Sequence, residues 1–241
     1  MVNRDWAKLL VVEFLGPFVL VFAGVGAILA TQDIVAIAFA HGLAIGLFVA
    51  AAGHISGGVF NPALSVGLWA TKKLDSTRAV AYIIAQLLGA LAGAAVVSAC
   101  FPEAIRDELN LGIPSVGTGF STTNALVMEI VLTFFLMFVV FGVAIDGRTG
   151  GRAIAGLAIG LTITMDIFPG GAVSGAAMNP ARWFGPAVIE NDYTDGWIWI
   201  VGPIIGAVAA ALLYNFVLLE EEPAAGASDV DPERPRAAPS G

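Results

Sequence analysis

Long stretches without Asp, Glu, Lys or Arg constrain the fold of this 241-residue chain more than any other feature of its sequence. A helix needs about 20 predominantly apolar residues to cross the hydrocarbon core of a bilayer. Charged residues make up only 12% of the chain, whereas soluble domains usually contain about 25%. We therefore predict an all-α membrane protein, and we exclude a soluble enzyme and a nucleic-acid-binding protein. The uncharged stretches are residues 14–32, 34–71, 79–102, 109–128, 130–145 and 196–219.

Six membrane-spanning helices and two shorter membrane segments account for this pattern. Residues 61–69 and 179–189 are too short to cross a bilayer and too apolar to lie in water. We expect these two segments to enter the membrane and stop, as re-entrant half-helices. The six predicted spans are residues 8–30, 34–53, 79–101, 122–145, 153–168 and 197–219.

The distribution of Lys and Arg predicts the orientation. With a cytoplasmic N-terminus, nine basic residues face the cytoplasm and only Arg106 and Arg182 lie on the other side. Cytoplasmic loops of membrane proteins carry such an excess. We expect both termini in the cytoplasm, residues 1–8 as the N-terminal segment, and a plasma membrane location. Residues 220–241 hold six acids and two arginines and are predicted to be a disordered, solubilising tail; partner binding is the alternative.

Residues 9–219 contain an internal repeat. The segment that starts at Glu13 is similar to the one that starts at Glu129, and the triplet at Asn61 matches the triplet at Asn179. Each repeat, about residues 9–101 and 122–219, contains three spans, and an odd number of spans inverts the second half relative to the first. Inverted repeats with interrupted helices place their site near the bilayer midplane.

The two matching triplets predict how the half-helices begin. Asn is a favoured N-cap and Pro a favoured first helical residue. The Gly-rich residues 54–60 and 170–178 before them are predicted to be extended, and irregular backbone at membrane depth lines a cavity or is buried in protein. An ordinary capped helix is the alternative for either triplet alone. The triplets are Asn61, Pro62, Ala63 and Asn179, Pro180, Ala181.

If the half-helices enter from opposite sides, their N-termini meet and repel cations, because each end carries about half a positive charge. The side-chain amides of Asn61 and Asn179 then donate to a passing neutral molecule, while backbone carbonyls on either side accept from it. Water held in this way cannot keep a proton-conducting chain aligned. The expected carbonyls belong to Gly57, Gly58, Val59, Phe60, Gly175, Ala177 and Met178.

Residues 54–65 and 174–187 resemble the two signature loops of the aquaporin, or major intrinsic protein, family. The resemblance extends over about residues 9–219. It implies a right-handed bundle of six helices with a water pore in each subunit, a homotetramer in a lipid bilayer, and no cofactor or metal.

The resemblance also implies a narrow selectivity filter near the outer mouth. Its four positions, carried over by their spacing from the two asparagines, are His41, Ile167, Ala176 and Arg182. This set is similar to that of the tonoplast intrinsic subfamily, which implies passage of water and of ammonia, urea or hydrogen peroxide. A glycerol facilitator is the alternative. Such channels typically carry Asp directly after the filter Arg and Lys four residues further on, where this chain has Trp183 and Ala187.

Individual side chains leave alternatives open. Arg182 is expected to face the pore and to bond loop carbonyls; the alternative is an arginine that extends to the outer interface. His41 is expected to be a pore donor, with helix packing as the alternative and gating by its protonation as a hypothesis. The resemblance implies that Glu13 and Glu129 accept hydrogen bonds from amides of the re-entrant loops, with a proton relay as the alternative. Asp166 is expected to be an acid at the outer interface.

Two other classes of membrane protein remain. An ion-coupled secondary transporter also uses inverted repeats, but it needs charged groups in the membrane that can couple ions. Only Glu13, Glu129 and Arg182 qualify, and two of these have structural roles in our interpretation. A membrane-embedded enzyme is not expected, because the sequence contains no nucleophile with a base and no metal-ligand cluster.

Overall fold

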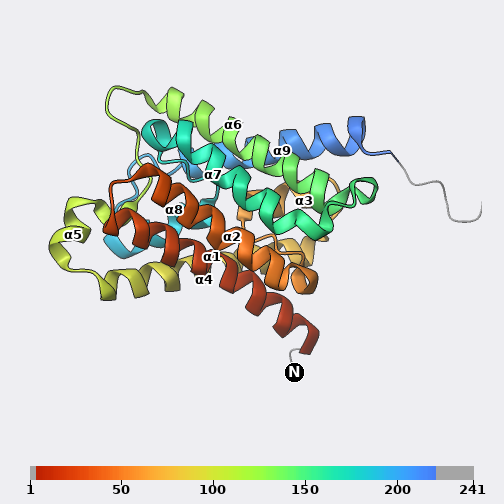
Figure 1. Cartoon of the computed structure of the whole chain (residues 1–241), viewed down its shortest axis with the longest axis horizontal. Helices are drawn as coiled ribbons and strands as arrows, with labels where there is room; N and C mark the ends of the chain where they lie inside the picture. The colour runs from red at the N-terminus through yellow and green to blue at the C-terminus, as the bar shows by residue number, and fades with distance from the viewer. Residues whose placement is uncertain (1–3, 221–241) are drawn as a thin grey trace, which may run out of the picture.

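The computed structural model describes residues 4–220, which form helices and connecting loops without any strand. Six long helices and two half-helices make up the bundle, with a short helix, α5, at one end of it (Figure 1). The helices are α1 Arg4–Ala30, α2 Ile34–Ser56, α3 Pro62–Ala70, α4 Ser76–Cys100, α5 Glu103–Glu108, α6 Thr122–Val140, α7 Ala155–Ser174, α8 Pro180–Glu190 and α9 Ile198–Leu213. Single turns lie at η1 Asn110–Gly112, η2 Phe141–Ile145, η3 Gly147–Thr149, η4 Gly151–Ile154 and η5 Tyr214–Leu218.

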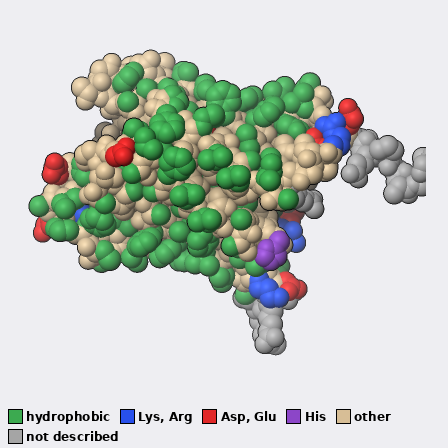
Figure 2. Space-filling view, viewed as in Figure 1, with side chains coloured by type: hydrophobic (Ala, Val, Ile, Leu, Met, Phe, Trp, Pro, Cys, Tyr) green, Lys and Arg blue, Asp and Glu red, His purple; other side chains and the backbone are tan. Residues whose placement is uncertain are grey.

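The six predicted membrane crossings are confirmed. Six helical stretches are long and apolar enough to span a bilayer, and they coincide with the predicted spans within a few residues at most ends. Hydrophobic side chains cover the middle of the face in Figure 2, and charged side chains gather at its two ends. The stretches are Asp5–Ala30, Ile34–Ser56, Ser76–Cys100, Thr122–Ile145, Ala155–Ser174 and Ile198–Leu218.

The extended stretches before the half-helices are shorter than we predicted. Residues 54–56 belong to α2, and residues 170–174 belong to α7, which continues past Pro169 where we expected it to end. A helix keeps its backbone groups hydrogen-bonded where there is no water, so both helices extend to a later stop. That stop is a glycine in the left-handed conformation, Gly57 (φ +99°) and Gly175 (φ +75°), the usual residue at this place.

Close helix packing follows the repeat. α1 packs on α4 as α6 packs on α9, while α2 and α7 cross each other. A Cβ at Gly89 would collide with the carbonyl oxygen of Phe14, and a Cβ at Gly206 with that of Ile130. Small residues allow membrane helices to approach this closely. Gly89 and Gly206 therefore serve close helix packing.

The half-helices lie inside this frame. α3 packs against α9 and α4, and α8 packs mainly against α4. The described ends of the chain, the start of α1 and the end of α9, lie away from α5, toward the other end of the bundle (Figure 1). The packing of the two half-helices brings the N-termini of α3 and α8 together in the interior. The predicted tail beyond residue 220 lies outside the described residues, as do residues 1–3.

Candidate functional site

The two half-helices begin at asparagines that contact each other's loops. The Oδ1 atoms of Asn61 and Asn179 accept from the amides of Ala63 and Ala181, at 2.9 and 3.0 Å. These bonds are N-caps, and both asparagines have extended backbone, with φ near −154° and −153°. Each asparagine is only 4% exposed. The sequence therefore starts both half-helices in the same way and in the protein interior.

The side-chain nitrogen of each asparagine, Nδ2, forms a hydrogen bond to the other repeat. Asn61 Nδ2 donates to the carbonyl of Met178 at 2.8 Å, and Asn179 Nδ2 donates to the carbonyl of Phe60 at 3.0 Å. A carboxamide nitrogen carries two hydrogens, so each cap keeps one donor beyond this contact. The two helix N-termini, with their partial positive charge, thus lie side by side.

Two buried glutamates hold the loops that lead to these caps. Glu13 on α1 accepts from the amides of Val59 and Phe60, at 3.0 and 2.8 Å. Glu129 on α6 accepts from the amides of Ala177 and Met178, at 2.9 and 2.7 Å. Both carboxylates are completely buried.

These bonds stabilise unusual backbone. Phe60 (φ +52°), Ala176 (φ +47°) and Met178 (φ +53°) adopt the left-handed conformation, which residues other than glycine rarely occupy. Such a conformation persists only where its surroundings hold it. The glutamates fix the amides of Phe60 and Met178, and the amide of Ala176 donates to Ser174 Oγ at 3.2 Å.

Several supporting side chains were missed by the sequence reasoning. Ser56 and Ser174, the last residues of α2 and α7, donate their hydroxyls to Glu13 and Glu129 at 2.6 and 2.7 Å. Tyr82 Oη donates to the carbonyl of Ser56 at 2.8 Å, and Trp199 Nε1 donates to that of Ser174 at 2.9 Å. The repeat offset relates each pair, so an alignment of the two halves is the signal that could have found them.

A cavity of about 220 Å³ runs beside the caps. Asn61 and Asn179 line it together with five of the seven residues whose carbonyls we expected at the pore: Gly57, Gly58, Val59, Ala177 and Met178. Phe60 and Gly175 are not part of the lining. The rest of the wall is mostly aliphatic, from Leu20, Ile45, Leu136, Ile159 and Ile163. The cavity therefore has one polar stripe on an apolar wall.

The four residues assigned to the filter are all buried, but they do not all line this cavity. His41 and Ala176 line it, while Ile167 and Arg182 do not. Arg182 lies on the first turn of α8 and donates Nη1 to the carbonyl of Gly112 at 2.6 Å. Its exposure of 2% excludes an arginine that extends to the interface.

His41 bonds within its own helix. Its Nδ1 lies 2.8 Å from the carbonyl of Ile37, so Nδ1 carries the proton in the neutral ring. The other nitrogen, Nε2, is then an acceptor. We predicted a donor at this position, and the geometry corrects that detail because the carbonyl fixes the tautomer. The ring also lies against Gly24 of α1.

Asp166 is not at the interface, as we had expected. It is 1% exposed and lies near enough to Glu129 for their charges to interact. Its Oδ2 has no hydrogen-bond partner among the described residues. The prediction was wrong because α7 continues two turns beyond Asp166 to Ser174, which places this residue inside the bundle.

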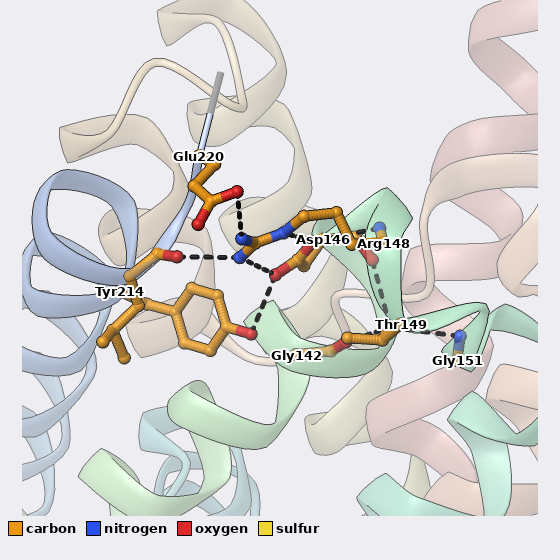
Figure 3. A network of polar contacts seen from close by, with 8 residues as sticks. Gly142, Asp146, Arg148, Thr149, Gly151, Tyr214 and Glu220 are labelled. Carbon is orange, nitrogen blue, oxygen red and sulfur yellow. Dashed lines mark hydrogen bonds and ion pairs between the residues drawn. The ribbon is translucent and has the colours of Figure 1, made fainter. Parts of the chain in front are cut away.

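A polar network links the turns that follow α6 and α9, at the end of the molecule away from α5 (Figure 3). Arg148 donates to both carboxylate oxygens of Asp146, at 2.9 and 2.7 Å, and to the carbonyl of Leu218 at 2.7 Å. It also lies 3.1 Å from Glu220, while Tyr214 donates to Asp146 at 3.1 Å. These hydrogen bonds hold the pKa of Asp146 below its ordinary value.

This network lies directly beside the cavity. Ala144 and Ile145, which precede Asp146, belong to the cavity lining, as do Lys73 and Arg78. The sequence reasoning did not single out Asp146 or Arg148, because an acid and an arginine two residues apart carry no specific signal.

Comparison with known proteins agrees with this architecture. Residues 2–214 match the model of the family described as "Major intrinsic protein". The chain is 38% identical to Aquaporin NIP1-1 of Zea mays, over 92% of this chain and 79% of the relative. It is 36% identical to Aquaporin TIP4-4 of the same species, over 87% of this chain and 86% of the relative.

A solved structure shows the same fold. The aquaglyceroporin from Plasmodium falciparum superposes with a TM-score of 0.79 and 26% identity, covering 88% of this chain and 96% of that one. Because relatives of NIP and TIP type match at similar identity, the likeness of the filter to the tonoplast subfamily remains a prediction. The family and the relatives are channel proteins and not enzymes. The chain belongs to the major intrinsic protein family and is an integral membrane protein that forms a passive channel for water and small solutes.

Proposed function

We propose that the chain conducts water, and with it ammonia, urea or hydrogen peroxide, while it excludes protons and ions. The reciprocal bonds between Asn61 and Met178, and between Asn179 and Phe60, carry this proposal. They leave one amide hydrogen on each asparagine at the point where two helix N-termini meet. A water molecule there accepts from the asparagines and donates to carbonyls on either side, so neighbouring waters cannot pass a proton along.

Ions face two obstacles in this arrangement. The paired helix ends repel cations, and the aliphatic walls offer no replacement for the hydration shell of an ion. A small neutral molecule needs only a few hydrogen bonds and can obtain them from the polar stripe. Small neutral solutes are therefore the class that the cavity suits.

The choice among solutes depends on His41, Ile167, Ala176 and Arg182, which we propose as the filter. Ile167 and Ala176 make two sides apolar and leave room, while Arg182 supplies donors and His41 an acceptor. Domain limits of residues 9–219, a homotetramer, a plasma membrane location and cytoplasmic termini are part of the same proposal.

A glycerol facilitator is the second candidate. An apolar wall formed by Ile167 and Ala176 suits the carbon backbone of a polyol, and one similar solved structure is named an aquaglyceroporin. Trp183 and Ala187 argue against a glycerol facilitator, because they occupy the positions where the family resemblance implies Asp and Lys in glycerol channels.

Stopped-flow measurements on proteoliposomes test these alternatives. We expect rapid water flow with a low activation energy, non-saturating entry of urea and ammonia, and little glycerol entry. Glycerol entry as fast as that of urea would favour the facilitator. Saturating transport that depends on an ion gradient would contradict a channel altogether.

The sites can be tested in the same assay. His41→Phe is expected to keep water flow and to lose urea flow, because it narrows the proposed filter. Urea flow equal to that of the unmodified protein would remove His41 from the filter.

A further inference from the structure

The turn η1, residues Asn110–Gly112, carries the carbonyl that accepts from Arg182. All three of its residues have left-handed backbone, with φ of +45°, +44° and +62°. Asn and Gly tolerate this conformation, whereas Leu111 rarely adopts it. The local sequence therefore does not suffice to fix the turn, and contacts from other elements must hold it.

One of these contacts is apolar and lies at the middle of the turn. Leu111 is completely buried and belongs to a cluster that includes Val25 of α1, Ala94 of α4 and Ala181 of α8. Ala181 directly precedes Arg182 in the chain. Leu111 thus holds the centre of η1 next to Arg182, the residue that donates to the carbonyl of Gly112.

A second contact is polar and lies at the start of the turn. Asn110 Nδ2 donates to Asp192 Oδ2 at 2.7 Å. Asp192 is itself fixed, because its amide donates to the carbonyl of Ala187 at 3.0 Å and its Oδ1 accepts from the amide of Thr194 at 3.0 Å. It lies just beyond the last residue of α8.

Consequently η1 is bonded to both ends of the same half-helix. Gly112 accepts from Arg182 on the first turn of α8, and Asn110 donates to Asp192 just after its last turn. We propose that Asn110 and Asp192 are a positioning pair, which holds the Gly112 carbonyl in place for Arg182 and thereby tunes the solute selectivity of the channel. This inference rests on the filter role proposed above for Arg182.

The position of Arg182 depends on the Gly112 carbonyl, because few hydrogen bonds fix the arginine side chain. Its Nη1 bonds the Gly112 carbonyl, its Nε has no hydrogen-bond partner among the described residues, and the side chain is 2% exposed. A guanidinium held in this way follows the carbonyl when the turn shifts. Such a shift changes the width of the constriction, and it affects a molecule larger than water more than it affects water.

Other contacts besides the Asn110–Asp192 pair also restrain α5 and the turn η1. Arg106 of α5 donates to Ser98 at 2.6 Å and lies 3.9 Å from Glu190, the last residue of α8. This link restrains α5, and Leu111 restrains the centre of the turn. Loss of the Asn110 bond should therefore loosen the turn without unfolding it.

Asn110→Asp is the most informative change, because it places a second carboxylate opposite Asp192. We expect the ratio of urea to water permeability in proteoliposomes to rise by roughly two- to fivefold, because an exposed hydrogen bond contributes at the low end of the usual range. Combining Asn110→Asp with Asp192→Asn restores a hydrogen bond in the reverse direction and should return the ratio to its original value. Asp107→Asn changes an exposed acid on α5 and should leave the ratio unchanged.

Arg182→Ala separates this inference from the proposed function. If Arg182→Ala leaves the ratio unchanged, the filter role fails, and the positioning role fails with it. If Arg182→Ala changes the ratio while Asn110→Asp does not, only the positioning pair is overturned. A changed ratio that the double substitution does not restore also overturns the pair. Should Asn110→Asp fail to fold, Asn110→Ala takes its place, and the same rise is required.

Discussion

In the first repeat, Glu13 accepts four hydrogen bonds, and one of them comes from Gln86 Nε2 of α4 at 2.8 Å. In the second repeat, Glu129 accepts three. Pro203 of α9 corresponds to Gln86, in the register that pairs Tyr82 with Trp199 and Gly89 with Gly206, and proline has no side-chain donor. The neighbouring Gly202 lies close to Glu129, since a Cβ at Gly202 would lie 2.8 Å from the Cβ of Glu129. The first repeat thus places a side-chain donor at this position, and the second repeat places a proline there.

The functional residues differ between the repeats as well. Arg182 follows Asn179 by three residues, and the equivalent position after Asn61 is Leu64, which is buried. The supporting frame is therefore shared, while the cation near the cap exists in only one half. The shared frame thus sets the position of the caps, whereas the filter that we propose takes His41 from the first half and Ile167, Ala176 and Arg182 from the second.

Removal of either glutamate should have the largest effect on stability. Glu13→Ala leaves buried amides without acceptors, and we expect a loss of about 4 kcal/mol or more, since each orphaned buried donor costs roughly 1 to 3 kcal/mol. Glu129→Ala should cost less, because one hydrogen bond fewer is broken. Thermal unfolding of the purified protein in detergent measures both. A stable Glu13→Ala protein with altered solute preference would contradict the structural role.

Substitution of the packing glycines tests whether the repeats are equivalent. Gly89→Ala and Gly206→Ala each force a methyl group against a backbone carbonyl, of Phe14 and of Ile130. We expect each to cost about 2 to 3 kcal/mol, the upper range for overpacking. The same unfolding experiment applies, with Gly26→Ala as the control, because nothing lies within 4 Å of a Cβ at Gly26. A large difference between Gly89→Ala and Gly206→Ala would break the equivalence.

Gln86→Leu should have a smaller effect. It removes the donor to Glu13 and the contacts of Gln86 with Ser65 of α3, at 3.1 and 3.3 Å. We expect a loss of about 1 to 2 kcal/mol, after which the first repeat holds its loop by backbone amides and a serine, as the second does. Unfolding of this variant beside Glu129→Ala shows whether that reduced set suffices. A loss as large as that of Glu13→Ala would show that Gln86 is essential to the loop.

The smallest effect concerns the network around Asp146, which the first repeat lacks. The Arg148 hydrogen bonds hold the pKa of Asp146 below its ordinary value, so the charged form is stabilised by folding. This contribution is fully present above about pH 4, the ordinary pKa of Asp, and is lost as the pH falls through the lowered pKa. Asp146→Asn should thus lower the melting temperature slightly at pH 7, and the difference from the unmodified protein should shrink in acid. A difference independent of pH would contradict the assignment.

The sequence predicted the spans, the inverted repeat and the two caps, because each has a strong local signal: uncharged length, a shared motif, and Asn before Pro. It did not predict the side-chain donors to Glu13 and Glu129, since Ser56, Gln86 and Ser174 are polar residues in apolar helices whose partners are distant in sequence. It also placed Asp166 wrongly, because Pro169 and two glycines indicated a helix end that membrane burial overrides. The bond of Arg182 to a loop was expected, but the identity of Gly112 depends on tertiary structure.

The central claim is that the caps at Asn61 and Asn179 form one cation-excluding constriction, and Asn179→Asp tests it most directly. This change replaces an amide donor by a carboxylate at the meeting point, while Asn191→Asp makes the same change at the C-terminal end of α8. Water permeability and cation leak are measured on the same proteoliposomes. We predict that Asn179→Asp admits cations, whereas Asn191→Asp leaves the leak at its original level. Equal leaks from the two variants and the unmodified protein would contradict the account.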